Sequence, residues 1–291
     1  MLVNTVEQER ALFGDDPFGF ADLGYIEGKT VAFERRFANG NLDRLAGLAQ
    51  ELVNLKVDVI VTGGPGVYAA HRATATIPIV VGTIGDPVGQ GFAVSLSHPG
   101  GNITGSAIFA PEVMAKRLEL LKQIIPSLKR VGVLLVHSYA ANPQYIAILA
   151  PTARALNLEL SPIEVAGPDS YNDVFSAKAM TSIDGMVITE TAQLMANAAL
   201  IASLAMTRGL PAVGAPAQAA AGALLGYGVS QKALFHNAAA FADKILKGAK
   251  PGDIPFEQAT KFETVVNLKT ARAIGVDIPA TVLAAADEVI E

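Results

Sequence analysis

The chain has 291 residues, of which 51% are hydrophobic and 17% are charged, and its formal net charge is −5. This length allows one large domain or two medium ones with a substantial core, and this composition excludes a disordered chain. The absence of cysteine excludes disulfides, thiolate catalysis and cysteine-ligated zinc, and the scattered Lys and Arg residues provide no basic face for nucleic acid.

Short β-branched runs alternate with helical patterns from residue 29 onward. The runs expected as strands are KTVAFERRF (29–37), VDVIVTGG (57–64), IPIVVGT (77–83), KRVGVLLVHS (129–138), LELSPIEVA (158–166), IDGMVITET (183–191) and LPAVGAP (210–216). The stretches expected as helices are 43–56, with Asp43 as its N-cap, 111–128, 142–157 and 191–209. Because apolar strands that alternate with amphipathic helices form parallel sheets covered on both faces, we expect an α/β fold.

Two such series predict two similar α/β lobes. The segment 99–111, PGGNITGSAIFAP, lies between them, and its Gly, Asn and Thr residues indicate an extended crossing. The tail is expected to begin with one long helix that ends at Gly248, followed by an extended piece, a short strand and a helix, and it could cross back to the first lobe and return. The expected division is 1–105 with about 229–258 in lobe 1, and 106–228 with about 259–291 in lobe 2.

The apolar runs are all shorter than the roughly 18 residues that a membrane-spanning helix needs. The longest are ALIASLAM and AAAGALLGYGV. The chain begins MLVNTVEQER, which has no basic segment ahead of an apolar one, unlike a signal peptide. We therefore expect either a cytoplasmic protein or a chain that has lost its leader.

Two glycine-rich motifs invite comparison with phosphate-binding loops. GYIEGKT (24–30) is not a Walker A loop, because only three residues separate Gly24 from Gly28 and a helical pattern precedes a strand pattern, so we expect a helix C-cap and a turn. TGGPG (62–66) follows a strand and opens a helix, where free amides could bind an anion such as a carboxylate. It could equally be an ordinary tight turn, and it lacks the full dinucleotide fingerprint.

The motif GDPVGQG (85–91) places Asp86 at the carboxyl end of a strand, where ligands bind in open α/β sheets. Asp86 could cap a following helix, with Pro87 at the first helical position. It could also present its carboxylate to the ammonium group of a ligand. The two roles are compatible with each other.

Other patterns that carry chemistry are missing from the sequence. The four histidines, His71, His98, His137 and His236, lack metal-ligand spacing, and no G-x-S-x-G elbow or glycosidase-like acidic pair stands out. We therefore expect no metal and no cofactor, and a binding protein more than an enzyme. Four tyrosines near strand ends or helix starts could each stack on an aromatic ligand or be ordinary half-buried residues: Tyr68, Tyr139, Tyr145 and Tyr227.

Four stretches of the chain resemble the ABC transporter substrate-binding proteins of the tryptophan/tyrosine-binding type. They are LGYIEGKTVAFERRFANGNLDRLAGLAQELVNLKVDVIVTGG, ATATIPIVVGTIGDPVGQGFAVSLSHPGGNITG, PEVMAKRLELLKQIIPSLKRVGVL and KILKGAKPGDIPFEQATKFETVVNLKTARAIGVDIP. The resemblance implies a type I periplasmic-binding-protein fold, with two Rossmann-like lobes of parallel sheet, a three-crossing hinge and a ligand held between the lobes. It also implies a monomeric periplasmic or membrane-anchored receptor that delivers an amino acid or small carboxylate, most often aromatic, to an ABC permease.

The same resemblance implies a set of ligand-binding positions. Lobe 1 would contribute Gly63, Gly64, Pro65, Thr83, Ile84 and Asp86. Lobe 2 would contribute Ser138, Tyr139, Asn142, Thr189, Glu190, Gly214 and Ala215. The hinge would include Asn102, Thr104, Gly105, Gly226 and Gly228. We expect Gly63, Gly64 and Thr83 to take a carboxylate through amides or hydroxyls, and Asp86 or Glu190 to take an ammonium.

The chain departs from the family pattern in two places. MLVNT is at most a remnant of the usual first strand, which leaves open what Asn4 and Thr5 contribute to the site. The loop HSYAAN (137–142) replaces the more usual Asn-Pro form, which is compatible with a ligand other than tryptophan.

Two other classes of function compete with a receptor. One is a lyase-like or isomerase-like enzyme on a doubly wound fold, with Asp86 or His137 as the acid or base. The other is the input domain of a sensor or regulator, which a DNA-binding or membrane segment would support. Neither kind of segment is found in the sequence.

Overall fold

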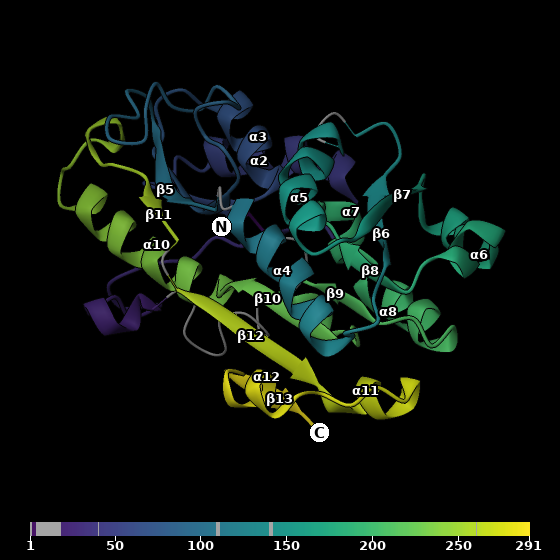
Figure 1. The fold of residues 1–291 in the computed structure, drawn as a ribbon. Helices are drawn as coiled ribbons and strands as arrows, with labels where there is room; N and C mark the ends of the chain where they lie inside the picture. The colour runs from purple at the N-terminus through teal and green to yellow at the C-terminus, as the bar shows by residue number, and fades with distance from the viewer. Residues whose placement is uncertain (1, 4–18, 40, 109–110, 140–141, 260) are drawn as a thin grey trace. The chain divides into compact units, whose positions relative to one another are not determined.

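The computed structural model describes residues 2–3, 19–39, 41–108, 111–139, 142–259 and 261–291 (Figure 1). The chain forms two compact units, Met1–Phe109 with Ser230–Lys261 (unit 1) and Ala110–Val229 with Phe262–Glu291 (unit 2). It therefore passes between the units three times, after residues 109, 229 and 261. The sequence-based division placed these passages after 105, 228 and 258.

Unit 1 is built on a parallel sheet that, in the described residues, has six strands in the order β11-β5-β4-β3-β1-β2. The strands are β1 (Leu2–Val3), β2 (Arg36–Phe37), β3 (Ile60–Gly63), β4 (Ile79–Ile84), β5 (Ile103–Ala107) and β11 (Glu257–Gln258). The helices are α2 (Leu45–Asn54), α3 (Pro65–Ala73) and α10 (Gln231–Leu246), with 3-10 turns η2 (Ala21–Leu23), η3 (Leu42–Arg44) and η6 (Pro251–Asp253).

Successive side chains along the strands of unit 1 point to opposite faces of the sheet and pack in two separate apolar clusters. Along β3, Ile60 packs in the cluster that contains the buried residues of α2 and α3, whereas Val61 packs with Phe235 and Phe241 of α10. This alternation follows from the two-residue period of a strand. The sheet is thus covered by α2 and α3 on one face and by α10 on the other (Figure 1).

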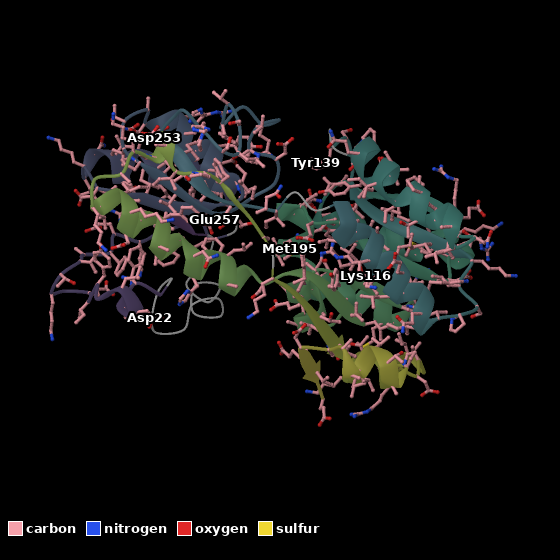
Figure 2. The ribbon with its side chains drawn as sticks, turned by 60° about the vertical axis from the view of Figure 1, so that its left-hand side comes forward. Asp22, Lys116, Tyr139, Met195, Asp253 and Glu257 are labelled. Atoms are coloured by element: carbon pink, nitrogen blue, oxygen red, sulfur yellow. The ribbon has the colours of Figure 1, made fainter. Side chains whose placement is uncertain are left out.

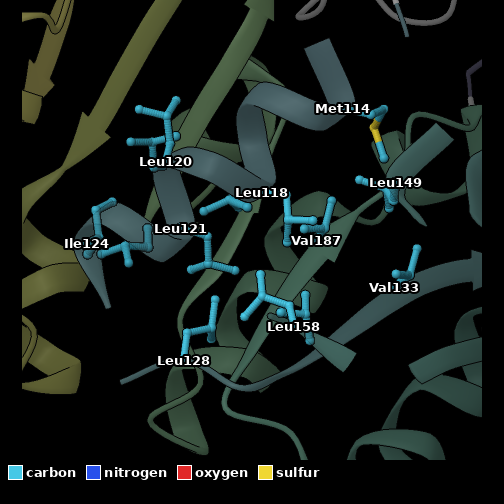
Figure 3. Packing of buried hydrophobic residues seen from close by; sticks show 14 of the residues in the cluster. Met114, Leu118, Leu120, Leu121, Ile124, Leu128, Val133, Leu149, Leu158 and Val187 are labelled. Atoms are coloured by element: carbon cyan, nitrogen blue, oxygen red, sulfur yellow. The ribbon is translucent and has the colours of Figure 1, made fainter. Parts of the chain in front are cut away.

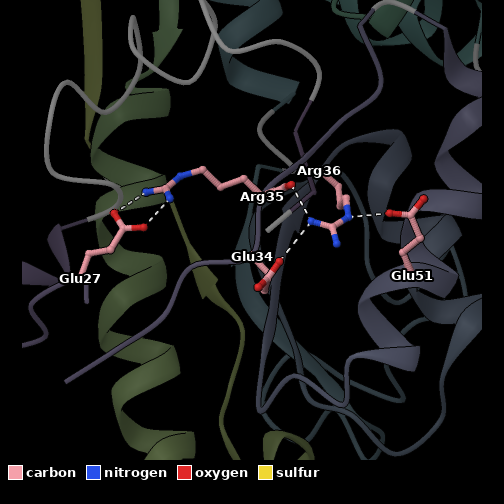
Figure 4. Close-up of polar contacts among 5 residues, drawn as sticks. All are labelled: Glu27, Glu34, Arg35, Arg36 and Glu51. Carbon is pink, nitrogen blue, oxygen red and sulfur yellow. Dashed lines mark hydrogen bonds and ion pairs between the residues drawn. The ribbon is translucent and has the colours of Figure 1, made fainter. Parts of the chain in front are cut away.

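The edge of this sheet is shorter than the sequence indicated. Of the expected strand 29–37, only β2 joins the sheet, and an isolated bridge pairs Glu27 with Val31. Charged residues of this stretch form ion pairs with Glu27 and with Glu51 (Figure 4). Arg36 Nε donates to Glu51 of α2 at 2.6 Å, and Arg35 forms two hydrogen bonds with Glu27 at 2.6 and 2.9 Å. Charged side chains of this kind block further pairing at a sheet edge.

Two helix expectations in unit 1 were wrong. Asp43 does not cap α2, because Asn41 accepts the Asp43 amide at 3.0 Å and caps η3, which leads into α2 at Leu45. No helix follows Asp86 before β5 among the described residues, since residues 87–91 form turns. In the apolar stretch beyond them, Phe92 and Ala93 are buried, whereas Val94 is 82% exposed.

The segment expected as a crossing also differs. Residues 103–107 of the stretch 99–111 form β5, a buried strand that pairs with β4. By contrast, the turn at 24–30 is as expected, with Gly24 as the left-handed C-cap of η2 at φ 83°.

Unit 2 contains a larger sheet, with seven strands in the described residues in the order β13-β12-β10-β9-β8-β6-β7. The strands are β6 (Arg130–Val136), β7 (Glu159–Val165), β8 (Gly185–Ile188), β9 (Ala212–Gly214), β10 (Leu225–Val229), β12 (Phe262–Asn267) and β13 (Glu288–Ile290). The helices are α4 (Pro111–Ile124), α5 (Asn142–Ala155), α6 (Tyr171–Ser176), α7 (Ala192–Ala196), α8 (Ala198–Thr207), α9 (Pro216–Ala220), α11 (Leu268–Ile274) and α12 (Ala280–Ala284), with 3-10 turns η4 (Pro168–Ser170) and η5 (Lys178–Ser182).

In this sheet, too, successive residues of a strand pack on opposite faces. Val133 of β6 packs with Leu118 and Leu121 of α4 and with Leu149 of α5 (Figure 3). The next residue, Leu134, packs in the cluster of α6 and α8. The core of unit 2 therefore lies on both faces of the sheet, as expected for a parallel α/β arrangement.

Two strands of unit 2, β12 and β13, are parallel to each other and run against the other five. β10 and β12 pair antiparallel, with Val229 opposite Phe262. The chain leaves unit 2 after Val229 and re-enters it at Phe262, so β10 ends where β12 begins. The two strands must therefore run in opposite directions.

In the described part of the chain, no helix has the length and apolar character needed to span a bilayer.

Candidate functional site

In unit 1, the loops after β3 and β4 meet at the carboxyl edge of the sheet. Gly63 is paired with Thr83 in the ladder, and the Gly64 amide donates to the Thr83 carbonyl at 3.2 Å. Gly64 is the N-cap of α3, with φ 54°, and Pro65 is the first helical residue. The prediction that the loop after β3 opens a helix is confirmed, whereas the loop after β4 leads into a turn.

The Gly64 amide cannot act as we expected. Its hydrogen is donated to Thr83, so it is not available to a ligand carboxylate. What the loop offers an anion is instead the positive end of the α3 dipole at Pro65.

Glycine is needed in these strands because α10 lies against them. A Cβ atom on Gly63 would lie 2.9 Å from Cζ of Phe235, and one on Gly82 would overlap the Phe235 ring. Phe235 is itself buried. The two glycines therefore let α10 approach the ends of β3 and β4 closely.

Asp86 caps a turn rather than a helix. Its Oδ1 atom accepts hydrogen bonds from the amides of Val88 at 3.1 Å and Gly89 at 2.9 Å. The side chain is half-buried. Of the two roles open from the sequence, capping is observed, and contact with a ligand ammonium stays a prediction.

An aromatic group lies beside this edge, on α3 and the turn after β4. Tyr68 is 43% exposed and packs edge-on against Phe92, with ring centroids 4.9 Å apart. His71 contacts the same Phe92 ring, with centroids 5.3 Å apart. Tyr68 thus presents an aromatic surface one turn into α3.

In unit 2, the main polar feature is a buried arginine that sequence reasoning missed. Arg117 of α4 is completely buried, and its Nε donates to the Tyr227 carbonyl at 2.7 Å. Its Nη2 forms an ion pair with the carboxylate of Glu190, which follows β8. A Cβ on Gly228 would lie 3.0 Å from Nη2, so glycine there leaves room for the guanidinium. The available signal was a cation within the apolar stripe of helix 111–128, next to Leu118 and one turn after Met114.

Glu190 lies at the carboxyl edge of the sheet and is partly open to solvent, with 31% of its side chain exposed. The hydroxyl of Tyr145, on α5, donates to the Glu190 carbonyl at 3.4 Å. Burial raises the pKa of Tyr145, and the nearby charges of Tyr139 and Glu190 raise it further. Thr189 is buried, and its hydroxyl donates to the Leu134 carbonyl at 2.8 Å.

Gly214 is the last residue of β9, and both it and the following Ala215 are buried. The side chain of Gln218 accepts the Ala215 amide at 2.7 Å and donates to the Thr189 carbonyl at 3.5 Å. Gln218 therefore links the loop of Ala215 to the loop that carries Glu190.

The loop after β6 carries the remaining candidates of unit 2. Ser138 is exposed and has φ 56°, a left-handed conformation that is uncommon for serine. Tyr139, labelled in Figure 2, is 44% exposed. Asn142 Nδ2 donates to the Val136 carbonyl at 2.8 Å, and its buried Oδ1 has no partner within the described ranges. The loop thus presents one aromatic ring and a polar turn.

Four of the five residues expected at the hinge are strand residues, Thr104 and Gly105 in β5 and Gly226 and Gly228 in β10, and Asn102 immediately precedes β5. Asn102 donates to the carbonyls of Thr74 and Ile77, and Thr104 donates to the Ile254 carbonyl at 2.8 Å. A Cβ on Gly105 would clash with the backbone of Val81. A Cβ on Gly226 would clash with the backbone of Ala215 and Pro216. Their contacts are those of sheet residues, and their hinge role stays a prediction.

The remaining acid and base candidates belong to different units. His137 is exposed and lies 2.8 Å from Glu164, in unit 2, whereas Asp86 belongs to unit 1. Among the residues that the structure describes, no group of three His, Cys, Asp or Glu residues could hold a metal ion. Asn4 and Thr5 lie outside the described residues.

Comparison with known proteins places this arrangement in a family. The family model described as ABC transporter substrate binding protein matches residues 18–290. A tyrosine-binding protein from Clostridioides difficile is 26% identical over 255 residues, which is 87% of this chain and 73% of that protein.

Two solved structures have a similar fold. The ABC domain from Streptococcus pneumoniae in complex with L-Trp has a TM-score of 0.84 at 24% identity, with 99% of each chain covered. A conserved domain protein from Vibrio cholerae O1 biovar El Tor has a TM-score of 0.86 at 26% identity, covering 99% of this chain and 98% of that one.

Proposed function

The chain belongs to the family of ABC transporter substrate-binding proteins, and we propose that its cargo is a free amino acid with an aromatic side chain. Two similar proteins support this cargo: one is named a tyrosine-binding protein and the other was solved with L-Trp. The observation in this chain that carries the proposal is the half-exposed carboxylate of Glu190, which Arg117 holds at the carboxyl edge of unit 2 beside Tyr145.

Glu190 is suited to the ligand's ammonium group. Arg117 engages Oε1 and fixes the carboxylate, while part of the side chain is open to solvent. A fixed carboxylate loses little conformational freedom when it binds an ammonium, which favours affinity. Asp86 is the weaker candidate, because its Oδ1 already accepts two amides.

Aromatic surfaces are present at the same edges. Tyr139 is exposed after β6, and Tyr68 is exposed on α3. Offset or edge-to-face contact with a ligand ring would add to the energy of burying it. For the ligand carboxylate, we propose the start of α3, where the helix dipole favours a negative charge.

A ligand screen by thermal shift tests this assignment. The full chain is heated with each of the common amino acids, with deamino analogues of the aromatic ones, and with small dicarboxylates. An aromatic amino acid at about 100 times its Kd should stabilise the protein by about 2.7 kcal/mol. For a chain of this size that corresponds to a rise in Tm of roughly 5 to 10 °C. If only dicarboxylates raise the Tm, the cargo assignment is wrong.

Recovery of the ligand separates capture from catalysis. We propose a receptor without enzymatic activity, so an aromatic amino acid incubated with the protein should be recovered unchanged by mass spectrometry. A stoichiometric product that is absent from the protein-free control would instead support the lyase-like or isomerase-like alternative.

We further propose that the protein works outside the cytoplasm as a monomer and delivers its cargo to an ABC permease, as the family resemblance implies. Cell fractionation tests the location, and light scattering after gel filtration tests the oligomeric state. Loss of uptake of the labelled amino acid in a strain that lacks this protein tests the link to a permease.

A further inference from the structure

Unit 1 contains a cavity of about 570 Å³ that none of the proposed cargo-binding residues lines. It lies between the end of β5, the β11 segment and the first turns of α10. Pockets of a few hundred Å³ are large enough for a small organic ligand. This cavity is therefore a candidate for a second binding site.

The cavity wall contains an unsatisfied buried hydroxyl. Ser106 of β5 is 1% exposed, and its Oγ has no hydrogen-bond partner in the described part of the chain. Thr104, two residues earlier and on the same face of the strand, is also buried but donates to the Ile254 carbonyl. Because burying a polar group without a partner is unfavourable, Ser106 points to a polar group bound in the cavity.

The start of α10 gives the cavity a positive end. This helix has 16 residues, and Ser230, Ala233 and Leu234 of its first turn line the cavity. Ser230 Oγ accepts the Ala233 amide and its carbonyl accepts the Leu234 amide, which leaves the amides of residues 231 and 232 without an acceptor inside the helix. Free amides and the helix dipole together favour an anion.

The charged side chains at the cavity favour an anion as well. Lys261 lines the cavity and has no ion-pair partner within the described ranges. Glu257 also lines it, but its carboxylate lies 3.9 Å from the ammonium of Lys244. The negative charge is thus partly neutralised, while the positive charge of Lys261 is not.

An apolar surface completes the cavity. Leu234 and Phe256 are both buried and both line it. We propose that the cavity binds a small monocarboxylate, with its carboxylate on the Ser106 hydroxyl and the first turn of α10 and its short hydrocarbon part on Leu234 and Phe256. Ser230 and Lys261 adjoin two of the three passages between the units, so an occupant touches both ends of segment 230–261.

Titration of the full chain by NMR and calorimetry tests this site. The probes are acetate, butyrate, hexanoate and benzoate, with butanol and butylamine as neutral and cationic controls of matched size. Saturable binding is expected for the longer carboxylates and not for the two controls. Equal binding of butanol would overturn the assignment of an anion.

Variants locate the site. Ser106→Ala should weaken carboxylate binding at least tenfold, because it removes a hydrogen bond to a charged group, and Lys261→Gln should weaken it and reduce its dependence on salt. Ser203→Ala and Lys178→Gln, both exposed in unit 2, are the matched controls and should bind as the native chain does. Native affinity in Ser106→Ala would mean that the carboxylate does not bind at the Ser106 hydroxyl, and no saturable binding by any carboxylate would mean that the cavity is not a carboxylate site; either result would overturn the proposal.

The outcome is independent of the cargo assignment. Glu190→Gln should leave the affinity for butyrate unchanged, and a saturating aromatic amino acid should not displace it. Competition between the two would overturn a separate site, whereas failure of the amino acid to bind would leave the carboxylate result standing.

Discussion

The completely buried guanidinium of Arg117 is paired with the carboxylate of Glu190, 73 residues away in the same unit. The pair joins α4 to the loop after β8, and the Tyr227 carbonyl accepts a further hydrogen bond from Arg117 Nε. Burial makes the pair costly to break, since the remaining charge would have no partner in a low-dielectric environment.

Replacing Arg117 with methionine should destabilise the protein more than any exposed ion-pair variant. Methionine keeps an apolar chain of similar length but leaves the Glu190 carboxylate and the Tyr227 carbonyl without their donor. Loss of one partner of a buried pair costs about 3 to 5 kcal/mol, and the partial exposure of Glu190 reduces this to about 2 to 4 kcal/mol. Urea unfolding measures the change.

Arg36→Ala in unit 1 is the control for that variant. It removes the pairs with Glu34 and Glu51, whose acidic side chains are largely exposed, so stability should fall by less than about 1 kcal/mol. Equal losses for Arg117→Met and Arg36→Ala would mean that burial of the Arg117 pair contributes nothing.

The apolar alternation of the strands is what made the architecture predictable. Ile60 and Val61, or Val133 and Leu134, are both buried but on opposite faces, which only a covered parallel sheet allows. The antiparallel direction of β12 could not be predicted in the same way. It depends on where the chain re-enters unit 2, which is a property of the passages and not of the strand's own residues.

The candidate site was less predictable, because its key contacts join residues distant in sequence. Arg117 falls within the apolar stripe of its helix, but its partners Glu190 and Tyr227 are known only once the chain is folded. Similarly, the sequence offers Gly64 as a free amide, and only the folded loop shows that Thr83 accepts it. Local motifs thus placed these loops at strand ends but could not show which of their groups are engaged within the fold.

Glu190→Gln should remove discrimination in favour of the ligand's ammonium group. The native protein is expected to bind L-tyrosine more tightly than its deamino analogue, and the variant should bind the two within about threefold of each other because the amide carries no charge. Calorimetry with both compounds gives the ratio. Asp86→Asn should keep the native preference; if it loses the preference instead and Glu190→Gln keeps it, the roles of the two acids are reversed.

Tyr145 should make stability fall at high pH. Burial raises the pKa of Tyr145 in the folded protein above the value of about 10 in the unfolded chain. Above pH 10 the unfolded chain therefore loses a proton that the folded protein keeps, so this contribution to stability is complete below pH 10 and is lost as the pH rises beyond it. Unfolding by urea from pH 8 to 11 should show a steeper loss in the native chain than in Tyr145→Phe.

Absorbance titration gives an independent readout of the same group. The chain has six tyrosines, and the pKa values of Tyr25 and Tyr171 are also raised by burial. Tyr145→Phe should remove one phenol that titrates only at high pH. A native-like titration curve for Tyr145→Phe above pH 11 would contradict the assignment.

Gly82→Ala should destabilise unit 1 through a single steric contact. A Cβ at this position overlaps the ring of Phe235, so α10 must move away from β4 or the ring must leave its buried position. Overpacking of this kind costs about 1 to 3 kcal/mol.

Gly47→Ala is the matched control, because a Cβ there meets nothing within 4 Å, and in α2 it should stabilise by up to about 1 kcal/mol. The double variant Gly82→Ala with Phe235→Leu identifies the cause: if the clash with the ring is responsible, the two losses measured by urea unfolding will be clearly less than additive. Full additivity would place the strain elsewhere in β4.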